Sequence, residues 1–336
     1  MTATATHNHQ LIDRYRRHLN YLRVSITDRC NLRCLYCNPE DKIPKLPHSE
    51  ILSYEEILRI VAVGVDLGIT KVRVTGGEPL LRKNVCDLLG SLSAIEAISD
   101  VSLTTNAVLL EPLLPEIWSA GVRRLNISLD SLDANKYREI TGRDYFETVW
   151  RAIEAAHTMG FSPIKINVVA LQGYNDRDIA ELARLSIDWP FHVRFIEYMP
   201  IGFVDVQKER YLSSTQIKAH LTSIAPLHLV DRDAIDGPAQ RYRFEGGLGE
   251  VGFISAMSHH FCGACNRLRL TASGQLRACL MSDQEVDLKG PLRRGASDEQ
   301  LATLFHQAVQ HKPARHHMDK SRLVRNTTCP MSSIGG

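Results

Sequence analysis

Apolar and polar positions follow two different periods along the first 200 residues of this 336-residue chain. Short apolar or alternating runs are typical of strands, and the longer segments between them have the period of a helix. One such segment begins after Ser53, which can form a capping box with Glu56, and stops at Gly68. The strands are predicted at residues 22–27, 71–76, 101–106, 123–130, 164–170 and 192–199.

The six strand-helix units predict a parallel sheet that is either doubly wound or curled into an incomplete barrel. Unusual polar residues favour the curled form, because they lie toward the carboxyl ends of the strands, where parallel barrels collect their chemistry. They are the cysteines from Cys30 onward, Gly76-Gly77-Glu78-Pro79, Thr104-Thr105-Asn106, Ser128, Asp130, Lys165, Asn167, Arg194, Glu197 and Met199. The predicted fold class is therefore α/β, with an incomplete (β/α)6 TIM-like barrel over residues 20–199.

The pattern changes at about residue 200. A helix is predicted near residues 213–224, and the alternating runs on either side of Ser273-Gly274 indicate a hairpin. We expect residues 200–336 to form a C-terminal cap over the open side of the barrel. Residues 1–19 are expected to form a flexible N-terminal segment.

Composition limits the functions open to the chain. With 44% hydrophobic residues it can bury a full core, and its length leaves room for fewer than three domains. The 40 basic and 38 acidic residues give a net charge of +2, which argues against a general surface for nucleic acid. Any phosphate must then be bound by a local cluster of arginines and lysines. We expect a cytoplasmic protein without a membrane segment, because no run of about 18 apolar residues occurs and the N-terminus is polar.

Six of the eight cysteines fall into two groups, which indicates metal or redox work rather than disulfides in a reducing compartment. The first group, in the run CNLRCLYC, consists of Cys30, Cys34 and Cys37. Three thiolates leave one iron of a 4Fe-4S cluster open for a small molecule. The alternative is a zinc site, but structural zinc needs four ligands and the next candidate along the chain is His48. The run therefore favours an open cluster.

The second group of cysteines lies in the C-terminal region. Its members are Cys262, Cys265 and Cys279. With His259 or His260 they could close a zinc site, and this alternative stays open. Arg267 and Arg269 alternate along the strand that follows, so both side chains share one face and would suit a triphosphate. The competing interpretation of the two arginines is a solvated sheet edge.

The remaining cysteines and a pair of histidines give no site. Cys86 lies in a helical pattern, where a small buried hydrophobic residue is expected. Cys329 lies in a polar tail and has no assigned role. His316 and His317 belong to the basic segment HKPARHHMDK, which is expected to be a solvated loop because adjacent side chains on a helix diverge.

The CxxxCxxC run, with Tyr36 before its last cysteine and Gly76-Gly77-Glu78-Pro79 after the second strand, resembles the radical S-adenosylmethionine superfamily. More narrowly, residues 20–336 resemble the GTP 3′,8-cyclase family of molybdenum-cofactor biosynthesis. Ala107 departs from this family, which commonly has glycine after TTN. The motifs that carry the resemblance are LRVSITDRCNLRCLYC, RVTGGEPLLR, LTTNA, NISLDS, PIKINVVALQGYND, RFIEYMPIG, FCGACNRLRL with the later Cys279, and the terminal Gly335-Gly336.

The resemblance implies two 4Fe-4S clusters and S-adenosylmethionine as cofactors, and GTP as substrate. The two clusters would be bound by Cys30, Cys34 and Cys37 and by Cys262, Cys265 and Cys279. S-adenosylmethionine would be contacted by Tyr36, Gly77, Ser128 and Met199, and the missing Cβ atoms of Gly76-Gly77 would let the backbone approach it. GTP would be contacted by Arg23, Arg73, Thr104, Lys165, Arg267 and Arg269, with Arg23, Arg267 and Arg269 as catalytic residues. An alternative for Arg23 and Arg73 is a salt-bridge role at the rim.

The family chemistry implies that a 5′-deoxyadenosyl radical removes hydrogen from C3′ of GTP. C3′ then bonds to C8 of guanine and gives 3′,8-cyclo-7,8-dihydro-GTP. The open iron of the second cluster would hold the guanine. Gly335-Gly336 would reach into the site, whereas the alternative for this tail is a frayed end. The implied partners are an electron donor of the flavodoxin or ferredoxin type and the downstream cyclic pyranopterin monophosphate synthase, with a homodimer as one oligomeric form.

Two other functions stay open from the sequence. One is a radical S-adenosylmethionine enzyme that modifies a peptide and uses the second group as an auxiliary cluster. Such enzymes often carry a larger set of cluster cysteines than this C-terminal region offers. The other is a noncatalytic protein with two zinc sites, which the lack of an obvious fourth ligand at either site argues against.

Overall fold

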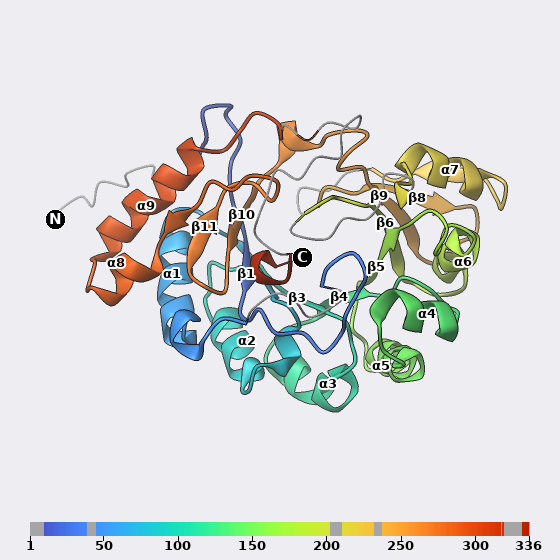
Figure 1. Cartoon of the computed structure of the whole chain (residues 1–336), viewed down its shortest axis with the longest axis horizontal. Helices are drawn as coiled ribbons and strands as arrows, with labels where there is room; N and C mark the ends of the chain where they lie inside the picture. The colour runs from blue at the N-terminus through green and yellow to red at the C-terminus, as the bar shows by residue number, and fades with distance from the viewer. Residues whose placement is uncertain are drawn as a thin grey trace.

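A single sheet organises the protein. The structure, a computed structural model, describes residues 10–38, 45–201, 210–231, 237–316, 318 and 331–335. In these residues twelve strands pair in the order β12-β11-β10-β1-β2-β3-β4-β5-β6-β9-β8-β7. Figure 1 shows the strands curving around the centre of the molecule, with helices on the outside. Three residues that carry sequence predictions, His317, Cys329 and Gly336, lie outside the described residues.

The six predicted strands are confirmed, and each runs parallel to its neighbour. They are β1 (Tyr21–Ser25), β2 (Lys71–Thr75), β3 (Asp100–Thr105), β4 (Arg124–Ser128), β5 (Ile164–Ala170) and β6 (His192–Glu197). The helices between them are α1 (Tyr54–Asp66), α2 (Val85–Ser93), α3 (Leu110–Ser119), α4 (Ala134–Thr141), α5 (Phe146–Thr158) and α6 (Ile179–Asp188). The predicted capping box is also present, because Ser53 and Glu56 accept hydrogen bonds from each other's backbone N–H groups.

The central strands have one apolar face and one polar face. On β1, Leu22 and Val24 are buried in the core shared with the helices, whereas Tyr21 and Arg23 line a cavity on the inner side. Side chains alternate across a strand, so the same division recurs along the neighbouring strands. Burial of the outer face stabilises the barrel, and the inner face is left for chemistry. In the described ranges no helix combines the length and the apolar character needed to cross a membrane.

The C-terminal region extends the sheet at both edges, a feature that the prediction of a cap did not include. β10 (Arg267–Leu270) pairs with β1 and β9 (Glu250–Ile254) pairs with β6, both in parallel. The outer strands are antiparallel: β11 (Gln275–Arg277), β12 (Val286–Asp287), β8 (Gln240–Phe244) and β7 (Leu227–Leu229). Pairing satisfies edge N–H and C=O groups of the six-stranded barrel that would otherwise need water or another partner. The barrel and the C-terminal region therefore share one sheet.

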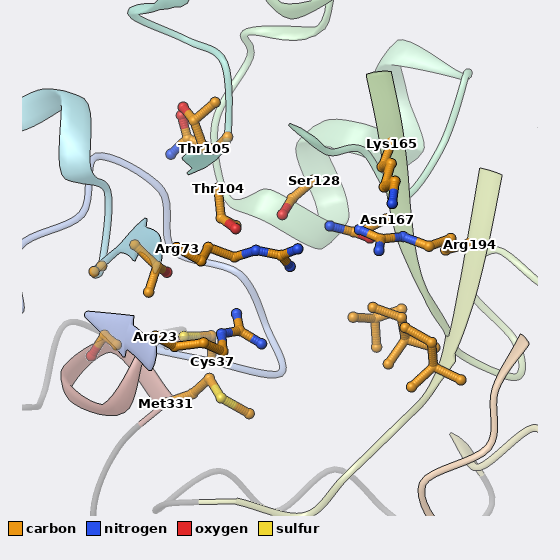
Figure 2. A pocket seen from close by; sticks show the side chains of 18 of the residues that line it. Arg23, Cys37, Arg73, Thr104, Thr105, Ser128, Lys165, Asn167, Arg194 and Met331 are labelled. Carbon is orange, nitrogen blue, oxygen red and sulfur yellow. The ribbon is translucent and has the colours of Figure 1, made fainter. Parts of the chain in front are cut away.

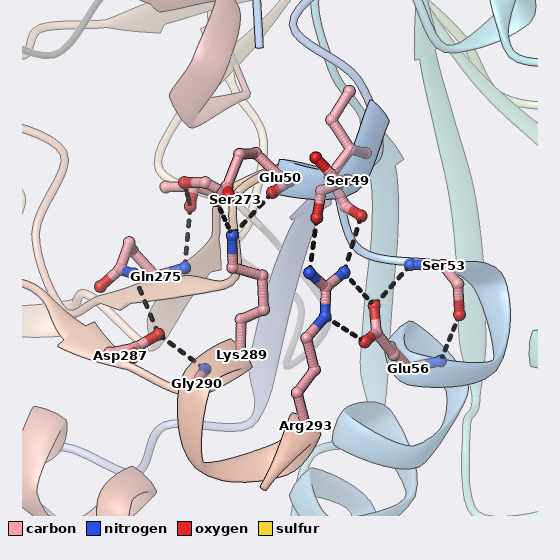
Figure 3. Close-up of polar contacts among 12 residues, drawn as sticks. Ser49, Glu50, Ser53, Glu56, Ser273, Gln275, Asp287, Lys289, Gly290 and Arg293 are labelled. Carbon is pink, nitrogen blue, oxygen red and sulfur yellow. Dashed lines mark hydrogen bonds and ion pairs between the residues drawn. The ribbon is translucent and has the colours of Figure 1, made fainter. Parts of the chain in front are cut away.

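The remaining helices are α7 (Ser214–Thr222), α8 (Lys289–Arg293), α9 (Asp298–Gln310) and α10 (Met331–Ile334). α7 confirms the helix predicted after residue 212, and the β10–β11 pair confirms the hairpin at Ser273-Gly274. Polar contacts join α8 to the start of α1 (Figure 3). Arg293 donates from Nε and Nη2 to the two carboxylate oxygens of Glu56, at 2.6 and 3.0 Å. α10 lies inside the curve of the sheet, near β1 (Figure 1).

Residues 10–19 are packed against the barrel. For these ten residues, the prediction of a flexible segment is wrong. Leu11 and Leu19 are 1% and 2% exposed and belong to the main core. Ile12 and His18 form an antiparallel bridge. Arg17 donates to the carbonyl oxygen of Cys262 at 2.7 Å, so this segment also contacts the second group of cysteines. Apolar side chains and an arginine with buried partners therefore hold it in place.

Candidate active site

A cavity of about 260 Å³ lies on the inner side of the sheet. Figure 2 shows side chains from several strands converging on it, among them Arg23, Arg73, Lys165 and Arg194. Most of the predicted site residues line the cavity: Cys30, Cys34, Cys37, Tyr36, Gly77, Ser128, Met199, Arg23, Arg73, Thr104, Lys165 and Arg267. Arg269 and the second group of cysteines do not appear among its lining residues. The structure thus brings together the first cysteine group and most of the predicted cofactor and substrate contacts.

The first three cysteines, hereafter the first triad, lie on the loop that follows β1. The loop is fixed to the end of α4, because Arg33 N donates to Thr141 O at 2.8 Å and Leu35 N donates to Ile140 O at 2.9 Å. Burial raises the pKa of all three thiols, that of Cys37 to about 12. A metal deprotonates a coordinating thiol outright, so a cationic cluster suits these buried sulfurs. The donor set, three thiols with no carboxylate among them, fits an iron-sulfur cluster.

The second glycine of the GGEP run also has a structural reason that the sequence did not show. A Cβ on Gly77 would lie 2.3 Å from the carbonyl oxygen of Arg29, far inside contact distance. Gly77 N also donates to Thr27 O, and Glu78 N donates to Arg29 O, both at 2.7 Å. Gly77 therefore allows two loops to pack backbone against backbone, and the room that its missing Cβ would leave for the cofactor stays a prediction. Glycine at this position holds the loop of the first triad.

Glu78 connects the GGEP run with the end of β3. Its carboxylate accepts from Asn106 N at 2.7 Å, Thr105 Oγ1 at 2.8 Å and Leu80 N at 3.1 Å. Asn106 in turn donates from Nδ2 to the Sγ atom of Cys30 at 3.7 Å. Ala107 has a φ of +63°, a left-handed conformation that favours glycine and explains why glycine is suited to this position. The three motifs thus form one hydrogen-bonded unit around the first triad.

Tyr36 is held by a buried carboxylate. Its hydroxyl donates to Asp130 Oδ2 at 2.6 Å, and the other oxygen of Asp130 accepts from Val169 N at 2.8 Å. Burial raises the pKa of Asp130 to about 6, while the tyrosine hydroxyl opposes this shift. The contact fixes the aromatic ring beside the cavity and links the cysteine loop to β4 and β5.

Basic side chains fill the opposite part of the cavity. Burial and the nearby Arg73 lower the pKa of Arg23 to about 9, and burial together with Arg73 does the same to Arg194. Cations that disfavour one another in this way attract a polyanion. In the described residues, Thr104 Oγ1, Asn167 Oδ1 and Arg194 Nε are buried without a hydrogen-bond partner. Phosphate oxygens would accept from Thr104 and Arg194, whereas the oxygen of Asn167 needs a hydroxyl or N–H donor from the ligand.

The cavity also contains residues that our sequence interpretation did not assign to the site. They include Tyr21, Lys71 and Arg124, as well as Asn167 and Arg194, which the sequence marked as polar residues toward strand ends without giving them a role. Each lies two positions from another inward-facing residue of its strand, as Lys71 does from Arg73. The alternation of polar residues along β2 and β5 was therefore a usable signal.

Arg269 is directed to the C-terminal tail. Its backbone lies opposite Arg23 in the β1–β10 pair, and its guanidinium donates to the carbonyl oxygen of Gly335. A Cβ on Gly335 would lie 2.6 Å from Thr75 Cγ2, so only glycine fits there without a shift. Met331 and Ser332 line the cavity. Met331 and Ser332 thus bring the tail to the cavity. The entry of Gly335 into the site and the direct contact of Arg269 with substrate stay predictions.

Cys262, Cys265 and Cys279, hereafter the second triad, are half-buried. Cys262 begins a 3₁₀ helix (Cys262–Ala264), and Cys265 ends it. Burial raises the pKa of Cys265, but Arg267 and Lys312 more than offset this and lower it to about 6. In the described part of the chain no three His, Cys, Asp or Glu side chains converge tightly enough to hold a single metal ion. A cluster differs in this respect, since each thiolate binds its own iron.

The basic segment after α9 is not the solvated loop that we predicted. Lys312 is 2% exposed and His316 is 8% exposed. Lys312 donates to Cys265 Sγ, and His316 Nε2 lies 2.8 Å from the carbonyl oxygen of Ala256. Sequence pattern failed here because the basic residues turn inward, toward carbonyl and thiol groups contributed by distant segments.

A parallel partial barrel, with a buried thiol triad after its first strand and a cavity beside it, defines a radical S-adenosylmethionine enzyme. The profile of the Radical SAM superfamily matches residues 24–186, and that described as Molybdenum Cofactor Synthesis C matches residues 191–318. The chain belongs to the GTP 3′,8-cyclase family. It is 48% identical over 325 residues to the GTP 3′,8-cyclase of Moorella thermoacetica, covering 96% of this chain and 99% of that protein. It is also 48% identical over 335 residues to that of Heliobacterium modesticaldum, covering 97% and 100%.

Solved structures support the fold. The structure of Streptococcus suis SuiB bound to S-adenosylmethionine is similar with a TM-score of 0.62 and 14% identity, covering 87% of this chain and 69% of that chain. SuiB bound to the precursor peptide SuiA gives a TM-score of 0.58 at 15% identity. Likeness at this level of identity concerns the fold alone, so it does not favour a peptide as substrate here.

Proposed function

We propose that this protein is a GTP 3′,8-cyclase that acts in molybdenum-cofactor biosynthesis. One observation carries the proposal: a single cavity joins the first triad to basic side chains from several strands, including Arg23, Arg73 and Lys165. The full-length identity to named cyclases supports the same substrate. The C-terminal profile, whose description refers to molybdenum-cofactor synthesis, supports the pathway.

The cofactors would supply the radical chemistry. When bound, the first 4Fe-4S cluster and S-adenosylmethionine would provide the 5′-deoxyadenosyl radical that removes the C3′ hydrogen of GTP. Bond formation between C3′ and guanine C8, followed by uptake of one electron from the external donor and one proton, would yield 3′,8-cyclo-7,8-dihydro-GTP. Cys30, Cys34 and Cys37 would hold the cluster. Tyr36, Gly77, Ser128 and Met199 all line the adjoining part of the cavity and would surround the cofactor. Exclusion of water and fixed geometry are the protein's main contributions.

The chain's own residues would bind and orient GTP. Guanidinium groups pair with phosphate oxygens through two N–H donors, and a lysine adds a point charge. Arg23 and Arg73 lie opposite each other on β1 and β2, so their side chains leave adjacent backbone positions on the same face. Thr104 would supply a hydroxyl from β3, and its buried oxygen has no other partner among the described residues. This arrangement would keep C3′ close to C8, which accounts for much of a ring closure.

The second triad would hold a second 4Fe-4S cluster that positions the guanine. Arg267 supports this assignment, since it begins the strand immediately beyond Cys265 and also lines the cavity. It could therefore contact a nucleotide that lies between the two triads. We further propose that electrons come from a donor of the flavodoxin or ferredoxin type and that the product passes to cyclic pyranopterin monophosphate synthase.

An anaerobic assay tests the proposal. The reconstituted protein, supplied with S-adenosylmethionine and dithionite, should release deoxyadenosine and a cyclised guanosine product only when GTP is present. Arg73→Ala should weaken GTP binding about 10- to 100-fold, because a hydrogen bond to a charged group contributes about 1.5–3 kcal/mol. Arg151→Ala removes an exposed arginine of α5 and is the matched control.

Two results would refute the proposal. Deoxyadenosine release that depends on a peptide and ignores GTP would favour the peptide-modifying alternative. Metal analysis that finds zinc and no iron in anaerobically purified protein would remove the enzyme assignment altogether. Equal GTP affinity of the two arginine variants would show that the basic part of the cavity is not the triphosphate site.

A further inference from the structure

Lys312 lies beneath the second triad with its ammonium fully engaged. It follows the end of α9 by two residues and is 2% exposed. Its Nζ donates to Ala278 O at 2.6 Å, Arg267 O at 2.9 Å and Cys265 Sγ at 3.5 Å. An ammonium group has three N–H donors, so these partners use all of its capacity. The side chain is therefore a buried structural lysine and not a surface lysine.

The three partners connect the two halves of the second triad. Cys265 and Arg267 belong to the segment that enters β10, whereas Ala278 directly precedes Cys279. One side chain thus joins the strand after the second cysteine to the residue before the third. The separation of these cysteines along the chain is bridged by a contact from a third segment, which fixes their relative position.

The anionic neighbours of Lys312 are the thiols themselves. Its polar partners in the described residues are two carbonyl oxygens and the sulfur of Cys265, so a metal-bound thiolate at Cys265 would be the negative charge in direct contact with it. A buried cation is retained when it is paired, and metal-bound thiolates provide that pairing. The ammonium would therefore be balanced by the ligands of the cluster.

Arg17 is a second buried cation that contacts the same region, but it forms an ion pair with Asp13. Arg17 donates from Nη1 to Cys262 O and from Nη2 to Pro313 O, both at 2.7 Å. Its Nε donates to Asp13 Oδ2 at 2.6 Å. Arg17 therefore anchors the segment that carries Lys312, while its charge is offset by Asp13. Lys312 thus acts on the second triad together with Arg267 and Arg269, and its ammonium is the group that bridges Cys265 to the residue before Cys279.

The charged groups around the two triads differ. Two buried carboxylates, Glu78 and Asp130, act on Cys30 and Cys34 of the first triad, alongside the cations Arg33 and Lys45, whereas cations act on the second triad. The potential of an iron-sulfur cluster depends on nearby charge and on hydrogen bonds to its sulfurs. A cation that donates to a ligand sulfur stabilises the state with one more electron.

We propose that Lys312 is a positioning residue of the second triad, and that its charge raises the reduction potential of the cluster bound there. This inference rests on the proposed function, in that it requires a second 4Fe-4S cluster. The redox change is the gain of one electron by the oxidised cluster, supplied in the test by dithionite, with no bond formed or broken. Lys312 would thus make the second cluster easier to reduce at a fixed donor potential.

The test is a redox titration of the full chain followed by electron paramagnetic resonance. The three cysteines of the first triad are changed to serine, so that the signal comes from the second cluster alone. In this background Lys312→Met should retain iron and shift the midpoint potential to more negative values. A tenfold change in the one-electron equilibrium, which corresponds to about 59 mV, is expected. Lys312→Gln, which keeps a hydrogen-bond donor without the charge, should shift it in the same direction.

Controls separate charge from general damage. Lys218→Met removes a lysine of α7 that donates to Tyr242, and it should leave the potential unchanged. In a second background, with the second triad changed to serine, Lys312→Met should not move the potential of the first cluster. If Lys312→Met or Lys312→Gln loses iron from the second triad, Lys312→Arg should restore it, because it restores the cation.

The outcomes are decisive. Retained iron with an unchanged potential would overturn the inference, and so would lost iron that Lys312→Arg does not restore. Retained iron with a more negative potential, or iron restored by arginine, would support it. A parent protein that binds only one cluster would instead refute the proposed function, whatever Lys312 does.

Discussion

Glu197 joins the end of the barrel to the region of the second triad, and its removal should destabilise both. The side chain is fully buried. Its carboxylate accepts from the backbone N–H groups of Ser214, Met257 and Ser258, each at 2.8 Å, and from the hydroxyl of Ser258. Burial raises the pKa of Glu197, but these hydrogen bonds more than offset it and leave the pKa below its ordinary value. The ionised carboxylate is therefore the form that the fold requires.

Glu197→Ala would leave three buried N–H groups without an acceptor. An unsatisfied buried donor costs about 1–3 kcal/mol, but the three donors share one site that water could enter, so their penalties do not add fully. The Ser258 hydroxyl has another partner, since it lies 3.1 Å from His259 Nδ1. We expect a loss of about 3–5 kcal/mol in the free energy of unfolding. Glu197→Gln keeps the volume and one oxygen, so it should lose about half as much.

The assay is thermal unfolding of the anaerobic protein, read together with its iron content. The expected order of unfolding temperatures is wild type, then Glu197→Gln, then Glu197→Ala. Iron should leave the second triad first, because Met257 and Ser258 precede Cys262 by only a few residues. Glu111→Ala, at an exposed ion pair on α3, is the control and should change little. Equal unfolding temperatures for Glu197→Ala and Glu111→Ala would refute the reasoning.

Three other substitutions test separate contacts. Gly77→Ala should lose iron from the first triad, because its Cβ meets a backbone carbonyl, whereas Gly90→Ala, with no atom closer than 3.9 Å, should keep it; equal iron contents would contradict this. Burial raises the pKa of Asp130 from 3.8 to about 6, so its stabilising contribution is present below the lower value and is lost as the pH rises through the higher one. When the pH is raised from 5 to 7, the unfolding temperature of Asp130→Asn should therefore fall less than that of the wild type. An equal fall in the two proteins would argue against the shift. Arg293→Ala breaks a partly exposed pair with Glu56 and should lower the free energy of unfolding by under about 1 kcal/mol in chemical denaturation, while a loss above about 2 kcal/mol would show that the contact is stronger than an ordinary surface pair.

The barrel could be predicted because its information is local. Each strand is marked in the sequence by a short apolar run or by alternating apolar and polar residues. The six predicted strands differ from the observed ones by no more than two residues at either end. The first triad was predictable for the same reason, since its three cysteines lie on one loop and meet the cavity together. Lys71 was missed and Arg194 was noted without a role, although the alternation of their strands contained the signal.

The rest could not be predicted because it depends on contacts between distant segments. The pairing of β10 with β1 joins residues more than 240 positions apart, and no local pattern marks it. Lys312 has the composition of a surface lysine and becomes a buried one only through carbonyls of β10 and of the residue before Cys279. Gly77 was identified, but its close approach to the backbone of Arg29 was not, because that contact joins two separate loops.

The register between β1 and β10 explains how one sheet can serve two triads. Arg267 lies opposite Tyr21 and Arg269 lies opposite Arg23, so both arginines turn toward the inner side. Leu268, between them, is fully buried on the outer side. A slip of one residue would exchange the two faces, directing Leu268 into the cavity and both arginines into the apolar core. Burial of that leucine therefore sets the register, and the register sets the distance between Cys265, just before β10, and the loop of the first triad after β1. The geometry between the two triads is in this way a consequence of strand pairing in the sheet.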